Sequence, residues 1–290
     1  MHTDPGSPER LVELLRGRRI AVLAGAGCST ESGIPDYRGP DSKPRTRAPI
    51  QYLEFTRDER ARIRYWTRSA VGWPRIANAS PNPSHYALAR LEQAGLLAGL
   101  ITQNVDGLHF KAGSTRVVEL HGSLSQVCCL TCRARLSRDA FQERLLSANP
   151  EWAQHLHATL ARPADVESAP DGDAALPDHL AHDFRVPPCA ACDGICKPDV
   201  VFFGENVPPD RVAEAWELFD SASVLLVIGS SLTVFSGRRF TERARAQGMP
   251  VGIINVGPTR ADEFAAVKVE GRLGEVLPPL VEQLLTQAAA

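Results

Sequence analysis

The stretch GAGCSTESGIPDYR, residues 25–38, decides the fold that we predict, because it begins where the apolar run IAVLA (residues 20–24) ends. This order is typical of a buried strand followed by a tight turn and a ligand-binding loop. Gly25 and Gly27 lack a Cβ, so the backbone can turn sharply and its N–H groups can approach a phosphate. The fingerprint of hydride-transfer enzymes requires a third glycine where Thr30 stands, so a plain glycine turn is the alternative.

Length and composition describe an ordinary globular protein. The chain has 290 residues, 43% of them hydrophobic and 23% charged, which suits one large domain or two small ones. A net charge of -2 favours no nucleic-acid partner. No apolar run approaches the roughly 18 residues of a membrane span, and the first ten residues lack a signal core. We expect a cytoplasmic monomer with no membrane partner, whose seven cysteines are metal ligands or buried thiols.

Apolar runs alternate with helical patterns along most of the chain. Further strands are predicted at residues 97–102, 117–120, 224–228 and 251–256, and helices at residues 9–16, 58–73, 84–94, 239–247 and 277–285. Ser84 is the expected cap of the third helix. This alternation predicts an α/β fold with a doubly wound parallel sheet. Residues 162–188, rich in Ala, Asp and Pro, are expected to form a long surface excursion.

Four cysteines form two CxxC pairs, a spacing that lets both thiolates of a pair reach one tetrahedral ion. They are Cys129, Cys132, Cys189 and Cys192. Because thiolates would fill all four positions, the sequence predicts one structural Zn²⁺ ion with no open position for a catalytic water. Two unrelated redox or buried pairs are the alternative. We interpret Cys128 and Cys196 as bystanders.

A polar cluster, TQNVD at residues 102–106, follows a predicted strand directly. Open α/β sheets bind their ligands at the carboxyl ends of strands. A histidine, His121, follows the next predicted strand. A neutral imidazole, with an ordinary pKa near 6.5, can accept a proton at neutral pH. A polar turn and a structural histidine are the alternative, and we interpret His85 and His109 in that way.

The glycine turn with GIPDYR, the TQNVD cluster and His121-Gly122 together resemble the sirtuins, and the likeness runs from residue 18 almost to the C-terminus. It implies a large Rossmann-like domain of residues 1–45, 96–125 and 200–290. It also implies a smaller domain made of a helical module, residues 46–95, and a zinc module, residues 126–199. NAD would bind between the domains as a co-substrate that is consumed.

The resemblance assigns roles to these residues. His121 would be the general base, Asn104 would orient ribose and water, and Asp106 would hold nicotinamide. In addition to Asn104 and Asp106, the residues that would contact NAD are Gly25, Ala26, Gly27, Ser29, Thr30, Gly33, Pro35, Asp36, Tyr37, Arg38, Gln103, Val105, Gly229, Ser230, Ser231, Asn255, Val256, Gly257 and Leu273. Cys28 replaces the usual small or aliphatic residue, and we interpret it as a buried filler.

The flanking sequence is similar to class II sirtuins, including the mitochondrial lipoamidase type. Tyr65 and Arg68 match the pair with which desuccinylase-type sirtuins bind an acidic acyl chain, and positions i and i+3 share a helix face. A packed Tyr beside a solvated Arg is the alternative. The segment VFFGE would pair with substrate peptide as an extra strand through Val201, Phe202, Gly204 and Glu205.

The resemblance therefore predicts an NAD-dependent protein-lysine deacylase, a transferase that releases nicotinamide and O-acyl-ADP-ribose and prefers acidic or long acyl groups to acetyl. The acyl oxygen would attack the ribose carbon that nicotinamide leaves, and His121 would then activate the 2′-hydroxyl. Three alternatives stay open at this stage. They are a protein mono-ADP-ribosyltransferase, a non-catalytic NAD-binding zinc protein and, least in keeping with Thr30, a dehydrogenase.

Overall fold

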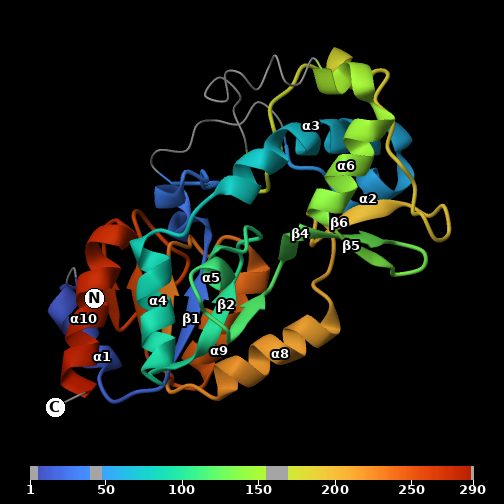
Figure 1. Cartoon of the computed structure of the whole chain (residues 1–290). Coiled ribbons are helices and arrows are strands. Elements are labelled where there is room, and N and C mark those ends of the chain that lie inside the picture. Colours follow the sequence, from blue (N-terminus) through green and yellow to red (C-terminus); the bar gives the residue numbers. More distant parts are fainter. Residues whose placement is uncertain (1–5, 40–47, 155–168, 289–290) are drawn as a thin grey trace.

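The computed structural model describes residues 6–39, 48–154 and 169–288. Residues 1–5 and 40–45 of the predicted large domain lie outside this description. So do residues 46–47 of the helical module, residues 155–168 of the zinc module and therefore the first part of the predicted surface excursion. Figure 1 shows two lobes, with the larger sheet in one and the cysteine-bearing strands in the other.

The larger lobe is built on a parallel six-stranded sheet of order β3-β2-β1-β7-β8-β9. Its strands are β1 (Ile20–Ala24), β2 (Leu97–Thr102), β3 (Val117–Glu119), β7 (Val224–Ile228), β8 (Val251–Ile254) and β9 (Val267–Val269). The five strands predicted from the sequence are all present, and the doubly wound α/β fold is confirmed. Because β2 and β7 flank β1 on opposite sides, the chain reverses direction across the sheet at β1, where such folds bind ligands.

Helices cover both faces of this sheet, which explains why its strands are continuous apolar runs. Ile20 and Val22 of β1 pack toward one face and Ala21 and Leu23 toward the other, and all four are buried. The first face is covered by α1 (Pro8–Leu15), α4 (Pro83–Gln93) and α10 (Leu273–Ala288), the second by α8 (Pro209–Asp220) and α9 (Phe235–Ala246).

The smaller lobe contains an antiparallel sheet of order β5-β4-β6. Its elements are β4 (Gly122–Cys129), β5 (Arg135–Ser137), β6 (Cys196–Val200), α2 (Tyr52–Arg57), α3 (Glu59–Asn78) and α6 (Arg138–Ala148). The fully buried rings of Tyr65, Trp66 and Phe141 join α3 and α6 to the sheet in one apolar cluster. The sequence analysis did not predict β4, β5, β6 or α6, because these elements are short or carry polar residues on one face.

Several helix boundaries differ from prediction. Helix α3 continues to Asn78 and α9 begins at Phe235, and two further differences have local reasons. Asn82, not Ser84, caps α4: its side chain accepts hydrogen bonds from the Ser84 and His85 amides, and Pro83 occupies the first helical position. The last helix begins at Leu273 and contains Pro278 and Pro279. These prolines are the sixth and seventh residues of the helix, past the four amides that lack intrahelical partners, so the Gly274 and Glu275 carbonyls accept no i+4 hydrogen bond.

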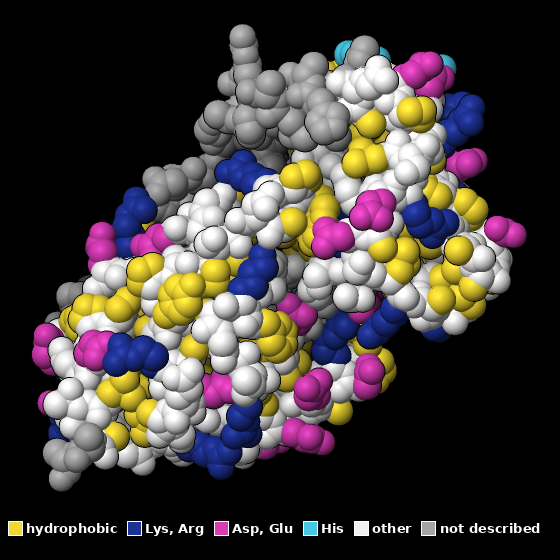
Figure 2. All heavy atoms as spheres, in the orientation of Figure 1, with side chains coloured by type: hydrophobic (Ala, Val, Ile, Leu, Met, Phe, Trp, Pro, Cys, Tyr) yellow, Lys and Arg dark blue, Asp and Glu magenta, His cyan; other side chains and the backbone are white. Residues whose placement is uncertain are grey.

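Helix α4 packs with the large sheet, since Leu88 and Leu91 belong to the same apolar cluster as β1 and α10. We therefore propose that the helical module ends with α3 and not at residue 95. Short helices complete the described chain: α5 (Leu108–Lys111), η1 (Ala26–Cys28), η2 (Thr30–Ser32), η4 (Asp178–Ala181) and η5 (Asp262–Phe264). No helix among the described residues is both long and apolar enough to cross a membrane. Acidic and basic side chains are interspersed on the face shown in Figure 2.

Candidate active site

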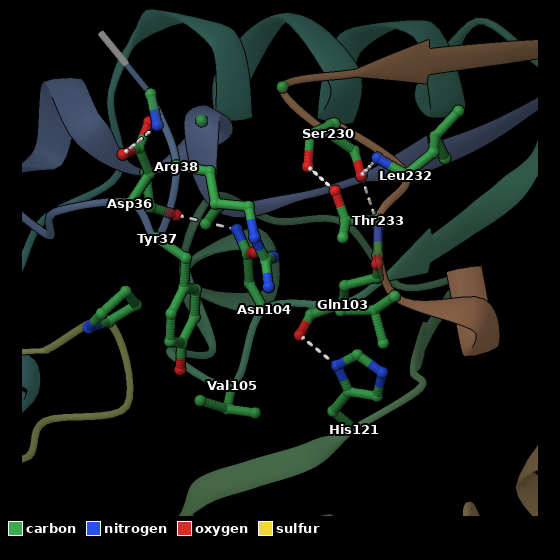
Figure 3. A pocket seen from close by; sticks show the side chains of 18 of the residues that line it. Asp36, Tyr37, Arg38, Gln103, Asn104, Val105, His121, Ser230, Leu232 and Thr233 are labelled. Atoms are coloured by element: carbon green, nitrogen blue, oxygen red, sulfur yellow. Dashed lines mark hydrogen bonds between the residues drawn. The ribbon is translucent and has the colours of Figure 1, made fainter. Parts of the chain in front are cut away.

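A cleft of about 2240 Å³ lies at the carboxyl ends of β1, β2, β7 and β8 and continues beneath the smaller lobe. Of the predicted NAD contacts, all but Gly25 line it. Figure 3 shows that residues 36–38 of the loop after β1 face the same space as Gln103, Asn104 and His121. The structure therefore brings together side chains that the sequence separates by more than 200 residues, from Ala26 to Leu273.

The glycine turn packs against the end of β7, which corrects the expected use of its amides. The N–H of Gly25 donates to the Ile228 carbonyl at 3.0 Å, and the N–H of Gly27 donates to the Gly229 carbonyl at 2.9 Å. A Cβ on Gly25 would lie 2.6 Å from the Gly229 oxygen. These glycines are thus required for close approach of two backbone segments, and their own amides are not directed at a phosphate.

Three side chains below the turn form one hydrogen-bonded network. Ser29 Oγ donates to Asp106 Oδ2 at 2.7 Å, and Asn104 Nδ2 donates to Ser29 Oγ at 3.1 Å and to the Gly25 carbonyl at 3.0 Å. Asp106 Oδ1 accepts from the Leu108 amide at 2.9 Å. Burial raises the pKa of Asp106 although these hydrogen bonds oppose the shift. The network fixes the rotamers of all three residues before any ligand arrives.

The tautomer of His121 follows from its two partners. Nδ1 lies 2.9 Å from the Gln103 carbonyl, which can only accept, so Nδ1 carries the proton. Nε2 therefore presents a lone pair, and it lies 2.7 Å from Ser236 Oγ, whose hydroxyl donates to it. Burial lowers the pKa of His121 to about 4, and the positive charges of Arg211 and Arg239 add to the shift. The ring is neutral at physiological pH and accepts a hydrogen bond from a hydroxyl.

The predicted peptide-binding segment follows β6 directly. Val201, Phe202, Gly204 and Glu205 all line the cleft. Glu205 is tied in place, since its carboxylate accepts from the Phe202 amide at 2.9 Å and pairs with the buried Lys197 ammonium at 3.0 Å. Phe203 is 37% exposed beside this turn. The contacts of the Glu205 carboxylate thus hold the segment in place, while the Phe203 ring stays partly exposed.

Tyr65 and Arg68 do not line the cleft among the residues that the structure describes. Tyr65 is 1% exposed, with its ring centroid 5.2 Å from that of Phe202 and 5.5 Å from that of Phe55. Arg68 Nε lies 2.7 Å from Asp173 Oδ1. The two side chains share a helix face as expected, but Arg68 is neutralised by a carboxylate of this chain.

Several cleft residues were missed by the sequence analysis. Ser236, at the start of α9, binds the catalytic candidate His121, and Arg239 one turn later lines the same space. Glu31 Oε1 accepts from the Gly274 amide at 3.2 Å and joins the glycine loop to α10. Nothing in the local sequence marks these residues, because their partners lie far away in the chain.

The four predicted cysteines meet at one end of the small sheet. Cys129 Sγ lies 3.6 Å from Cys192 Sγ, and Cys132 Sγ lies 3.7 Å from Cys189 Sγ. Four sulfurs around Zn²⁺ at about 2.3 Å are about 3.8 Å apart, so the cluster fits a tetrahedral zinc ion. All four sulfur atoms lie within 4.8 Å of one another, which supports the predicted structural zinc. Cys128 and Cys196 are not members of this cluster.

Comparisons with known proteins agree with this arrangement. Residues 25–236 match the family model described as "Sir2 family". The chain belongs to the Sir2 family. The predicted membership of the sirtuins is thereby confirmed, and the match includes the glycine turn, the TQNVD cluster, His121 and both CxxC pairs.

Individual sirtuins resemble the chain over nearly its whole length. "NAD-dependent protein deacetylase 1" of Mycobacterium avium (strain 104) is 50% identical over 278 residues, which cover 96% of this chain and 95% of the relative. "NAD-dependent protein lipoamidase sirtuin-4, mitochondrial" of Bos taurus is 46% identical over 283 residues, covering 95% and 87%. The assignment to class II stays a prediction.

Solved sirtuin structures share the whole fold. The structure described as "Structural Basis for the Mechanism and Regulation of Sir2 Enzymes" has a TM-score of 0.73 and 33% identity, and the match covers 97% of this chain and 98% of the other. "Sir2 bound to acetylated peptide" has a TM-score of 0.73 and 28% identity, covering 96% and 98%. The large sheet and the small lobe of this sirtuin therefore have counterparts in proteins of known structure.

Proposed function

We propose that this sirtuin is an NAD-dependent protein-lysine deacylase that releases nicotinamide and O-acyl-ADP-ribose. The observation that carries the proposal is the lone pair on His121 Nε2, which accepts a hydrogen bond from a hydroxyl at 2.7 Å inside the cleft. A group held in this state can take a proton from a ribose hydroxyl. The names of the relatives from Mycobacterium avium and Bos taurus, an NAD-dependent deacetylase and an NAD-dependent lipoamidase, support the same chemistry.

NAD supplies nicotinamide as a leaving group and a ribose that receives the acyl group. Around it, Asp106 would hold the nicotinamide amide, and Asn104 would orient ribose and water. Tyr37 and Arg38 would close over it from the loop after β1. The lining of the cleft by Ser230, Asn255 and Leu273 supports binding of the adenosine half at the ends of β7 and β8. The zinc ion would stabilise the small lobe without joining the reaction.

Peptide substrate would bind along residues 201–205. Extended peptides add to exposed backbone as an extra strand, and Val201 and Gly204 would supply that backbone. The carboxylate of Glu205 is tied to Lys197 and the Phe202 amide, so the segment is preorganised for this role.

For the acyl group, the placement of Arg68 favours long chains over acidic ones. An acidic chain would compete with Asp173 for the guanidinium, whereas a long apolar chain would meet Ile50, Val105 and Phe202, which line the cleft. We therefore propose that long acyl groups are removed faster than acetyl. Succinyl and glutaryl groups would be removed faster only if the Asp173 carboxylate released the Arg68 guanidinium.

The test is product analysis of one lysine peptide carrying acetyl, succinyl, glutaryl or lipoyl groups, with NAD, by mass spectrometry. Deacylation predicts loss of the acyl group and formation of O-acyl-ADP-ribose. Addition of ADP-ribose to protein would favour the mono-ADP-ribosyltransferase alternative, and binding of NAD without nicotinamide release would favour the non-catalytic one. Comparison with Asp173→Asn tests the acyl proposal: a gain confined to acidic acyl groups is expected, and equal turnover of acetyl and lipoyl peptides would contradict it.

A further inference from the structure

A second cluster of metal-ligating side chains lies behind the glycine turn, in the larger lobe and apart from the zinc cysteines. Cys28 comes from η1, His85 from α4 and His109 from α5. One ligand atom of each residue lies within 4.8 Å of those of the other two. The residues are 1%, 0% and 2% exposed, respectively. Three segments that are far apart in the sequence thus place one thiol and two imidazoles together in the core.

One member of the cluster, His109, lacks the hydrogen bonds that normally accompany such burial. Among the described residues, neither ring nitrogen of His109 has a hydrogen-bond partner. Cys28 Sγ faces His85 Nε2 at 4.0 Å, and the ring centroids of His85 and His109 are 4.8 Å apart. Burying a polar ring without partners costs free energy, and one of these two nitrogens lies within 4.8 Å of the ligand atoms of Cys28 and His85, which points to a ligand there.

We propose that Cys28, His85 and His109 form a three-coordinate site for Cu⁺. A thiolate and two imidazoles are soft to intermediate donors, which suit monovalent copper. The charges of one thiolate and one Cu⁺ cancel, whereas a divalent ion would leave a net positive charge in a dry core. Among the described residues, no further His, Cys, Asp or Glu joins this group, in contrast to the four cysteines of the zinc cluster.

The geometry requires only a small contraction. For bonds of about 2.0 to 2.3 Å to nitrogen and sulfur, three ligand atoms in a plane are about 3.5 to 3.8 Å apart. The observed separations of 4.0 Å to at most 4.8 Å therefore require each atom to move toward the centre by less than about 1 Å.

Binding also requires a defined change of protons. His85 Nδ1 accepts from the Asn82 amide at 3.3 Å, so the ring proton lies on Nε2. When copper binds, one Cu–S and two Cu–N bonds form and the S–H proton passes to solvent. The His85 ring proton moves from Nε2 to Nδ1, which gives up the long hydrogen bond from Asn82.

The test is anaerobic titration of the zinc-loaded full chain with Cu⁺, supplied as its acetonitrile complex, against the chelator bicinchoninate. Zinc content is followed by atomic emission and the copper ligands by X-ray absorption. We expect one Cu⁺ per chain, zinc retained, and a shell of one sulfur and two nitrogens. Cys28→Ser should weaken copper binding at least tenfold, while Cys128→Ser, a matched cysteine outside the cluster, should not change it.

Two results would overturn the proposal. One is an all-sulfur copper shell with release of zinc, which would place the copper on the zinc cysteines. The other is equal copper affinity in the wild type and in both Cys28→Ser and His109→Gln, each checked for native circular dichroism. If neither variant folds, the X-ray absorption shell of the wild type decides the question alone. Uptake of a second Zn²⁺ in preference to Cu⁺ would also contradict the assignment of the ion.

Discussion

The wall of the cleft that carries Ser29, Asn104 and Asp106 is held by hydrogen bonds between polar side chains, whereas the wall at Phe202 rests on packed aromatic rings that include Tyr65. The polar wall comes from short motifs at the ends of parallel strands. The aromatic wall is assembled from α2, α3 and the turn after β6. We therefore expect changes in the polar wall to affect catalysis and changes in the aromatic wall to affect the stability and shape of the site.

The largest effect is expected from His121→Ala. Without the basic nitrogen, kcat/KM for deacylation should fall about 10²- to 10⁴-fold, the usual contribution of a general base. Thermal unfolding should change modestly, because the ring makes two hydrogen bonds and each costs about 1 kcal/mol to lose. The matched control is His182→Ala, because His182 is exposed and remote from the cleft. Full activity of His121→Ala would remove this residue from the mechanism.

On the aromatic wall, Trp66→Ala should mainly lower stability. The ring is fully buried, with its centroid 4.5 Å from that of Phe141, and its indole N–H donates to the Cys196 carbonyl at 3.2 Å. Truncation of such a ring costs about 3 to 5 kcal/mol of unfolding free energy. Denaturant unfolding measures this loss. A fall in kcat at a low temperature, where the variant is still folded, would show that the aromatic wall also affects catalysis and would contradict the distinction between the two walls.

Ser29→Ala should give a smaller and mixed effect. It removes one donor to Asp106 and one acceptor for Asn104, so both polar groups lose a partner in a buried site. Such a loss costs about 1 to 3 kcal/mol. We expect KM for NAD to rise while the acyl ranking stays unchanged. Ser221→Ala is the control, because Ser221 donates to the Leu218 carbonyl, is exposed and does not line the cleft. A changed acyl ranking would show that the walls are coupled.

The smallest predicted effect concerns pH. Because the pKa of His121 is lowered to about 4, roughly one ring in a hundred is protonated at pH 6 and the neutral base persists through the physiological range. NMR shifts of the His121 ring should therefore stay constant between pH 8 and pH 6, with Nδ1 protonated throughout. A His121 midpoint near 6.5 would contradict the predicted burial effect.

The sequence predicted the polar wall well and the aromatic wall poorly, for a physical reason. Strands such as β1 and β7 are buried on both faces and appear as continuous apolar runs, and the motifs that follow them meet at one edge of the sheet. The pairing of Arg68 with Asp173 joins residues 105 positions apart. No local pattern encodes such a contact. The same holds for Ser236 and His121.

The two clusters that contain cysteine also show that local sequence patterns do not predict contacts between distant residues. CxxC spacing brings each pair of zinc ligands together locally, so the zinc site could be predicted from the sequence. Cys28, His85 and His109 carry no such spacing and were interpreted as structural. Only the packing of η1 against α4 and α5 reveals that their ligand atoms converge.

The most direct test of the proposed NAD-dependent deacylation traces the acyl oxygen atom of the substrate. A lysine peptide whose acyl carbonyl carries ¹⁸O is incubated with the enzyme and NAD, and products are analysed by mass spectrometry before exchange with water. We predict that ¹⁸O is found on the ribose carbon that nicotinamide leaves, because the acyl oxygen attacks that carbon. Recovery of ¹⁸O in a free carboxylic acid, formed without consumption of NAD, would show direct hydrolysis by water and contradict the account.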